Sequence, residues 1–123
     1  MSKTTIVVLS DPKGGEEALG RLFNALAAAY DFKSRKHDVA VVFQGTGTRW
    51  PALVLAEEHP AHALYRAVED KVAGVSLACA DVFGAAEEAA TNGFSLLSDN
   101  AVPGTRGLAS VAKYASEGSV LIF

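Results

Sequence analysis

Short apolar runs and longer amphipathic segments alternate along the whole chain. Residues 4–10 form a run of mainly β-branched residues that ends in polar turn residues, a pattern typical of a strand buried on both faces. A segment from Glu16 to Lys33 follows, and its apolar residues recur at helical spacing, at Leu19, Leu22, Phe23, Leu26 and Tyr30. Acidic residues at its start and basic residues near its end favour the helix dipole. This part of the chain therefore predicts a buried strand followed by an amphipathic helix.

The same alternation continues to the last residue. Further strands are expected over residues 38–45, 74–80, 94–98 and 119–123. Four helices are expected between these strands. The first opens at Pro51 and stops before Pro60, and the second covers 61–72 and ends at Gly74. The third covers 81–93 with Asp81 as N-cap, and the last contains Leu108, Val111, Ala112 and Ala115 and ends at Gly118. The order is thus strand, helix, strand, helix throughout.

This order predicts an α/β fold of one domain over residues 1–123. Strands that alternate with helices run parallel, with right-handed crossovers and helices on both faces of the sheet. About five mostly parallel strands fit a flavodoxin-like three-layer sandwich, whereas a six-stranded Rossmann sheet needs a longer chain than 123 residues. In a flavodoxin-like strand order of 2-1-3-4-5, the third strand lies beside the first. Cys79 is then expected to face the loop Ser10–Gly15.

Composition narrows the class of protein further. Half of the residues are hydrophobic and the mean hydropathy is +0.20, which indicates helices on both sides of a sheet or apolar surface used in self-association. A net charge of −3 argues against nucleic acid as the main partner. The apolar run Ile6–Leu9 is too short for a signal peptide, and no run approaches the roughly 20 residues of a membrane helix. We therefore expect a soluble cytoplasmic protein without a membrane partner.

Cys79 is the only cysteine of the chain, so it has no disulfide partner within the chain. One interpretation is a small apolar residue that fills space at the end of a core strand. The other is a reactive thiol, because Cys79 is expected at the carboxyl end of a strand and before a helix N-terminus, where a thiolate is favoured. Asp81 opposes the second interpretation, since its charge would repel a thiolate and no basic residue lies within five positions of Cys79.

Two glycine-containing loops follow the first two strands and are candidates for anion binding. The first, SDPKGG, could cradle an anion before a helix, although it lacks the P-loop pattern. The second, GTGTRW, begins like a dinucleotide fingerprint, but Trp50 replaces the third glycine and the loop follows the second strand, which excludes a nicotinamide site. The ligand-binding candidates in these loops are Ser10, Lys13, Gly14, Gly45, Gly47 and Arg49.

No cofactor or metal is expected. His59 and His62 stand three positions apart around Pro60 without an obvious third ligand, so an element boundary explains them better than a metal site. The first loop offers one serine and an aspartate that would repel phosphate, which argues against a flavin.

Four segments together resemble the DsrE/DsrF-like family: VVLSDPKGGEEA, VAVVFQGTG, VSLACADVFG with its single cysteine, and the terminal SVLIF. The resemblance covers nearly the whole chain in order and spacing. It implies a flavodoxin-like fold, a homo-oligomer (commonly a trimer or hexamer), and a role in sulfur relay between donor and acceptor proteins. The persulfide-carrying cysteine of the family corresponds to Cys79.

Two hypotheses of function therefore stand. The first is a cytoplasmic, oligomeric sulfur carrier or sulfurtransferase that passes persulfide sulfur through Cys79. The alternative is a non-enzymatic oligomeric module that binds a small anionic ligand through the loops Ser10–Gly15 and Gly45–Arg49, or binds a protein partner, with Cys79 in a structural role.

Overall fold

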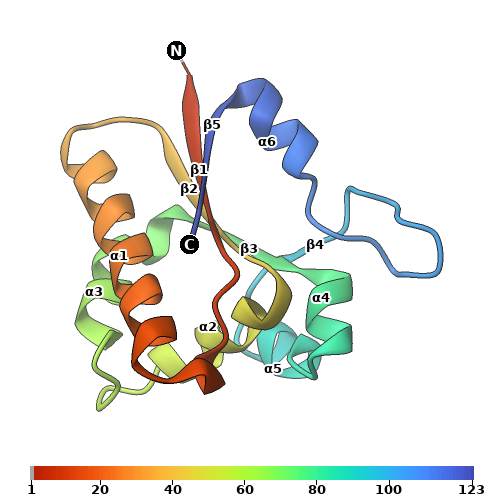
Figure 1. Ribbon diagram of the computed structural model, residues 1–123, viewed down its shortest axis with the longest axis horizontal. Coiled ribbons are helices and arrows are strands. Elements are labelled where there is room, and N and C mark those ends of the chain that lie inside the picture. The colour runs from red at the N-terminus through yellow and green to blue at the C-terminus, as the bar shows by residue number, and fades with distance from the viewer. Residues whose placement is uncertain (1) are drawn as a thin grey trace.

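Five parallel strands form the centre of the computed structural model, which describes residues 2–123 (Figure 1). The strands are β1 (Lys3–Val8), β2 (Val39–Phe43), β3 (Val72–Ser76), β4 (Leu96–Leu97) and β5 (Gly118–Ile122). The main helices are α1 (Gly15–Ser34), α2 (Trp50–Val54), α3 (His62–Val68), α4 (Leu77–Val82), α5 (Ala86–Thr91) and α6 (Val111–Glu117). Short 3₁₀ helices cover Pro12–Gly14, Gly45–Arg49 and Glu69–Lys71. The fold is an α/β domain with an all-parallel sheet, consistent with the predicted flavodoxin-like class.

The strand order is β4-β3-β2-β1-β5, so the expected order 2-1-3-4-5 is wrong. The first four strands lie side by side in chain order, and β5 returns to pair with the free edge of β1. Phe123 N donates to Val7 O at 2.9 Å, and Leu9 N donates to Phe123 O at 2.8 Å, which extends this pairing beyond β5. Because β2 lies between β1 and β3, the segment after β3 is one strand further from the loop after β1 than expected.

Side chains alternate between the two faces of the sheet, and each face has its own core. The larger core contains Ile6, Val41 and Phe43 together with the buried stripe of α1, and α3 packs beside α1 on this side. The smaller core on the other face contains Val42 and Tyr114, the latter from α6. Figure 1 shows α1 and α3 on one side of the sheet and α6 on the other.

Helix α1 matches its prediction to within one residue at each end. Leu22 and Leu26 are fully buried, as the helical spacing requires for one face of an amphipathic helix. Tyr30, counted in the same stripe, is instead 49% exposed. The buried stripe continues instead through Ala29, and Phe32 packs against the core in the last turn, so Tyr30 lies off the buried face.

The region of β3 and α4 differs from its prediction. The strand begins at Val72 and ends at Ser76, so Gly74 lies inside β3 rather than closing a helix. A side chain on Gly74 would collide with the Ser95 carbonyl oxygen, and the glycine thereby lets the segment before β4 approach. Helix α4 starts at Leu77, which makes Cys79 a residue of its first turn rather than the end of a strand.

The single helix expected over 81–93 is two short helices. Asp81 lies inside α4 and is not an N-cap; that position belongs to Ser76. Gly84 adopts a φ of +71° between α4 and α5, a backbone conformation that glycine tolerates best. The chain therefore turns at this glycine, and α5 packs separately.

Candidate functional site

Cys79 lies at the carboxyl edge of the sheet, in the first turn of α4. Its neighbours Ala78 and Ala80 are buried, whereas Cys79 itself is half-buried and Asp81 is exposed. The backbone N–H of Phe83 donates to the Cys79 carbonyl oxygen at 3.0 Å, so the two residues are one helical turn apart. Cys79 is thus a free thiol at the surface of the fold rather than a fully enclosed core residue.

A loop from Asn100 to Leu108, more than 20 residues after Cys79 in the chain, lies next to this helix. An antiparallel bridge between Asn100 and Leu108 closes the loop, which projects from the body of the molecule (Figure 1). The Gly107 carbonyl oxygen accepts a hydrogen bond of 2.9 Å from the Ala78 backbone N–H. Just after the loop, the Ala109 N–H donates to Ser76 Oγ at 3.1 Å. The start of α4 is therefore joined to this loop through its backbone.

Asp81 and Arg106 form a two-point ion pair between α4 and the 100–108 loop. Arg106 Nε lies 2.9 Å from Asp81 Oδ2, and Arg106 Nη2 lies 2.6 Å from Asp81 Oδ1. These hydrogen bonds and the charge of the guanidinium hold the pKa of the Asp81 carboxyl below its usual range. The acidic neighbour of Cys79 is consequently compensated by a cation that sequence analysis had not placed at the site, since 25 positions separate the two residues.

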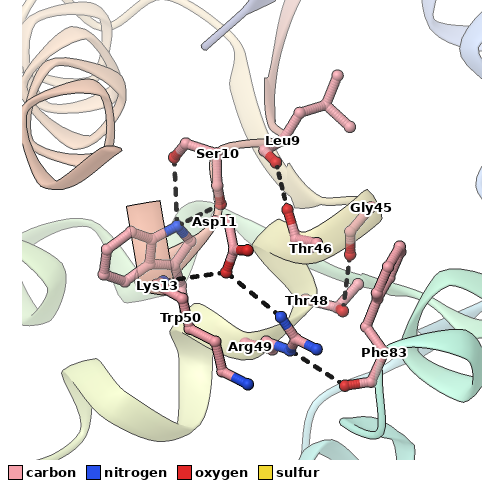
Figure 2. A network of polar contacts seen from close by, with 10 residues as sticks. All are labelled: Leu9, Ser10, Asp11, Lys13, Gly45, Thr46, Thr48, Arg49, Trp50 and Phe83. Atoms are coloured by element: carbon pink, nitrogen blue, oxygen red, sulfur yellow. Dashed lines mark hydrogen bonds and ion pairs between the residues drawn. The ribbon is translucent and has the colours of Figure 1, made fainter. Parts of the chain in front are cut away.

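The loops after β1 and β2 are joined by a second polar network, drawn in Figure 2. Asp11 Oδ1 accepts from the Lys13 backbone N–H at 3.0 Å and from Arg49 Nη1 at 3.3 Å. Arg49 Nε donates to the Phe83 carbonyl oxygen at 3.1 Å, and the guanidinium carbon lies 5.4 Å from the centre of the Phe83 ring. Arg49 thereby connects the loops that follow β1 and β2 to the end of α4.

This network occupies the donors expected to hold an anion in the first loop. The carboxylate of Asp11 takes the Lys13 N–H and one Arg49 nitrogen, as a bound anion would. Ser10 accepts the indole N–H of Trp50, at 2.8 Å through its carbonyl oxygen and 3.3 Å through its hydroxyl. The loop is therefore closed by the protein's own side chains.

The predicted glycines have packing roles in the structure. A side chain on Gly47 would collide with the Val8 carbonyl oxygen, so this glycine lets the loop cross the end of β1. Gly45 has a φ of +57° and lies against the Leu9 side chain, and a side chain on Gly14 would press on Ala18. Lys13 and Arg49 alone among the six candidates line the largest pocket described, of about 490 Å³.

The sequence-predicted site is thus divided into two places. Lys13 and Arg49 border the pocket, and Phe83 forms part of its wall, whereas Cys79 is not among the lining residues. The expectation that Cys79 faces the loop Ser10–Gly15 followed from the wrong strand order. In the structure, Arg49 and Trp50 of the intervening β2 loop make the contacts with that loop.

His59 and His62 have local roles. The Ala61 N–H donates to His59 Nδ1 at 3.1 Å, and His62 Nδ1 lies 2.8 Å from the Val54 carbonyl oxygen. Within residues 2–123, no three His, Cys, Asp or Glu side chains come together as a metal site would require. Over the same residues, every helix is too short or too polar to cross a membrane.

Comparison with known proteins adds two findings. The model of the DsrE/DsrF-like family matches residues 2–123. The crystal structure of the ychN protein from E. coli is similar over 100% of both chains, with a TM-score of 0.61 and 18% sequence identity, a likeness of fold. None of the curated proteins matches the chain.

Proposed function

The chain belongs to the DsrE/DsrF-like family, and on this basis we propose that it is a sulfur carrier that receives and passes on persulfide sulfur at Cys79. The observation that carries the proposal is that Arg106 pairs with Asp81, two residues after the half-buried free thiol of Cys79 in α4. An unpaired carboxylate two residues from Cys79 would oppose formation of the thiolate, which is the nucleophilic form of cysteine. Arg106 of the same chain pairs with this carboxylate and compensates its charge.

The proposed reaction has two balanced steps. The Cys79 thiolate attacks the outer sulfur of a donor persulfide, R–S–SH. The new S–S bond forms as the bond between the two donor sulfurs breaks, and the donor leaves as the thiolate R–S⁻. An acceptor thiolate then attacks the outer sulfur of the Cys79 persulfide. The bond between the two sulfurs breaks, the acceptor keeps the outer sulfur, and Cys79 is released as a thiolate for another cycle. Neither step needs a metal, a flavin or an external oxidant.

The alternative of an anion held inside the loops themselves, by their backbone N–H groups, has less support. The donors of the loops Ser10–Gly15 and Gly45–Arg49 are largely taken by Asp11 and by backbone carbonyls. The remaining cationic groups of these loops, Lys13 and part of the Arg49 guanidinium, line the neighbouring pocket.

Persulfide labelling tests the proposal directly. Wild-type protein incubated with glutathione persulfide should gain one sulfur atom at Cys79, detectable by mass spectrometry of the peptide and removed by dithiothreitol. It should then transfer this sulfur to a thiol acceptor. Cys79→Ser should take up no sulfur while it keeps the wild-type circular dichroism spectrum. A folded wild-type protein that stays unlabelled, under conditions that label the urea-unfolded chain, would contradict the proposal.

We also propose that the carrier is a cytoplasmic homo-oligomer and that β5 lies at the contact between copies. This strand is an edge of the sheet, so its outer backbone groups are free to pair. Leu121 and Ile122 on it are 38% and 59% exposed. A cytoplasmic location fits because reducing conditions there keep a single thiol available. Ile122→Lys should lower the mass measured by light scattering, whereas Val82→Lys, at a residue 74% exposed on α4, should leave it unchanged.

A further inference from the structure

The largest described pocket lies at the carboxyl edge of the sheet, away from Cys79. Three segments enclose it: the 3₁₀ helix after β1, the β2 loop with α2, and the chain from Phe83 into α5. Its volume of about 490 Å³ is in the range of sites that hold small organic molecules. Its walls are mainly apolar, with Pro12, Pro51, Ala52, Leu53, Phe83, Ala85 and Ala89 among the lining residues. An edge of this kind is where open parallel sheets bind their ligands.

Two cationic side chains at the pocket, Lys13 and Arg49, have free donors. Within residues 2–123, the Lys13 ammonium forms no ion pair, and Arg49 Nη2 donates no hydrogen bond. Thr48 offers no free donor, because its hydroxyl donates to the Gly45 carbonyl oxygen at 2.8 Å. In Figure 2 the side chain of Lys13 extends to the same side of the network as the Arg49 guanidinium. This end therefore suits an acceptor that carries negative charge.

Arg49 is held in place before any ligand arrives. Its Nε and Nη1 are bonded to Phe83 O and Asp11 Oδ1, its plane lies near the Phe83 ring, and the side chain is only 26% exposed. A group fixed in this way loses little conformational entropy when it binds a ligand. The pocket thus combines a preformed guanidinium with an exposed lysine.

Two carboxylates reduce the positive charge at the pocket. Asp11 neutralises part of the Arg49 charge at one end, and Glu88 lies among the lining residues on α5. Because these carboxylates repel a dianion such as a phosphate more strongly than a monoanion, a single negative charge suits Lys13 and the free Arg49 nitrogen better. Leu53 is 44% exposed at the pocket, so an apolar group bound there would cover apolar surface.

We propose that this pocket binds a small organic carboxylate with an apolar body of about the size of a phenyl ring. The carboxylate contacts Lys13 and Arg49, and the apolar body lies against Pro51, Leu53 and Phe83. Binding does not depend on Cys79, so the carboxylate site and the sulfur chemistry can be tested independently.

An NMR titration with four matched probes tests this site. Phenylacetate should shift backbone amides of residues 12–13, 48–53 and 83–89 in a saturable manner. Phenylacetamide and benzylamine, which remove or reverse the negative charge, and phenyl phosphate, which carries more charge on a larger head group, should bind at least roughly fivefold more weakly, a difference of about 1 kcal/mol. Cys79→Ser should bind phenylacetate as the wild type does.

Two variants and a control locate the contacts. Lys13→Met keeps the length of the side chain and removes the charge, and it should weaken phenylacetate binding by roughly three- to fivefold. Ala52→Phe fills the pocket from α2 and should abolish binding. Lys36→Met removes a charge at an exposed position outside the pocket and should have no effect. Absence of saturable shifts with phenylacetate, equal binding of phenylacetamide, or unchanged binding by Lys13→Met would each overturn the proposal.

Discussion

Arg106 forms two hydrogen bonds, of 2.9 and 2.6 Å, to the carboxylate of Asp81, and Asp81 lies two residues after Cys79 in α4. The ion pair joins the helix that carries the thiol to the 100–108 loop. Exposed ion pairs contribute little to stability, so we expect this pair to matter for the charge around α4 more than for holding the fold. Backbone contacts between Ala78 and Gly107 keep the loop in place independently.

We expect Arg106→Ala to slow the alkylation of Cys79 by iodoacetamide at pH 7 and low salt. The substitution leaves the Asp81 carboxylate unpaired, and an unpaired negative charge near the thiol disfavours the reactive thiolate. A several-fold decrease is expected, and it should shrink as added salt screens the charge. Stopped-flow alkylation with mass-spectrometric detection measures the rate.

The double variant separates charge from structure. Asp81→Asn combined with Arg106→Ala removes both charges and should restore the rate to near the wild-type value, because nothing then opposes the thiolate. Arg106→Lys should keep most of the rate. A double variant as slow as Arg106→Ala would show that the guanidinium acts by positioning the loop instead.

The same pair predicts the acid titration of Asp81. Hydrogen bonding to Arg106 and the guanidinium charge lower the pKa of Asp81 below its ordinary value of 3.8. A lowered carboxyl pKa means that the contribution of the pair is fully present above pH 3.8 and is lost as pH falls through the lowered value. Carboxyl ¹³C NMR should show Asp81 titrating below 3.8 in the wild type and closer to 3.8 in Arg106→Ala. Asp70 provides a control, because its lowered pKa comes from Lys33 and should not move.

A pair of glycine substitutions tests how the β2 loop crosses β1. Gly47→Ala should destabilise the protein by roughly 1–3 kcal/mol, because the new methyl group collides with the Val8 carbonyl oxygen at the end of a buried strand. Gly20→Ala is the matched change on α1, where an added methyl group meets no atom within 4 Å, and it should stabilise by about 0.5–1 kcal/mol. Urea unfolding measures both. Equal effects of the two substitutions would contradict the close contact at Gly47.

The buried phenol of Tyr65 should lower the free energy of unfolding at high pH. Burial, with a smaller effect from the Glu69 charge, raises the pKa of this phenol from 10.0 to about 12. A raised pKa means that the contribution is fully present below pH 10 and is lost as pH rises toward 12. The loss should be on the order of 2–3 kcal/mol. Tyr65→Phe should flatten this part of the profile of unfolding free energy against pH, while Tyr30→Phe, at an exposed residue, should leave it unchanged.

Elements governed by local pattern were predictable, and long-range pairings were not. Helix α1 follows from the spacing of Leu22 and Leu26 within a single segment. The order of the strands does not, because the right-handed crossover rule sets the handedness of a connection and not which neighbour the next strand joins. The wrong order then misplaced Cys79 relative to the loop Ser10–Gly15.

The boundary at Cys79 shows the same limit on a smaller scale. A short apolar run such as GVSLACA does not distinguish a buried strand from a buried helical turn. The Ala78 N–H bonds to Gly107 and the Ser76 hydroxyl bonds to Ala109, residues about 30 positions away. These tertiary bonds accompany the change from strand to helix at Leu77, and no local pattern contains them.

The sequence by itself determined the fold class, the parallel strands and the presence of one cysteine at the carboxyl edge, because hydrophobic periodicity and chain order act within each segment. It also supplied Lys13 and Arg49 as candidates for binding. Only the tertiary structure decided that Asp81 is paired, that Asp11 fills the expected anion cradle, and that the pocket lies apart from Cys79. Those outcomes depend on charges brought together by folding across 25 to 38 positions, a distance over which sequence patterns carry no geometric information.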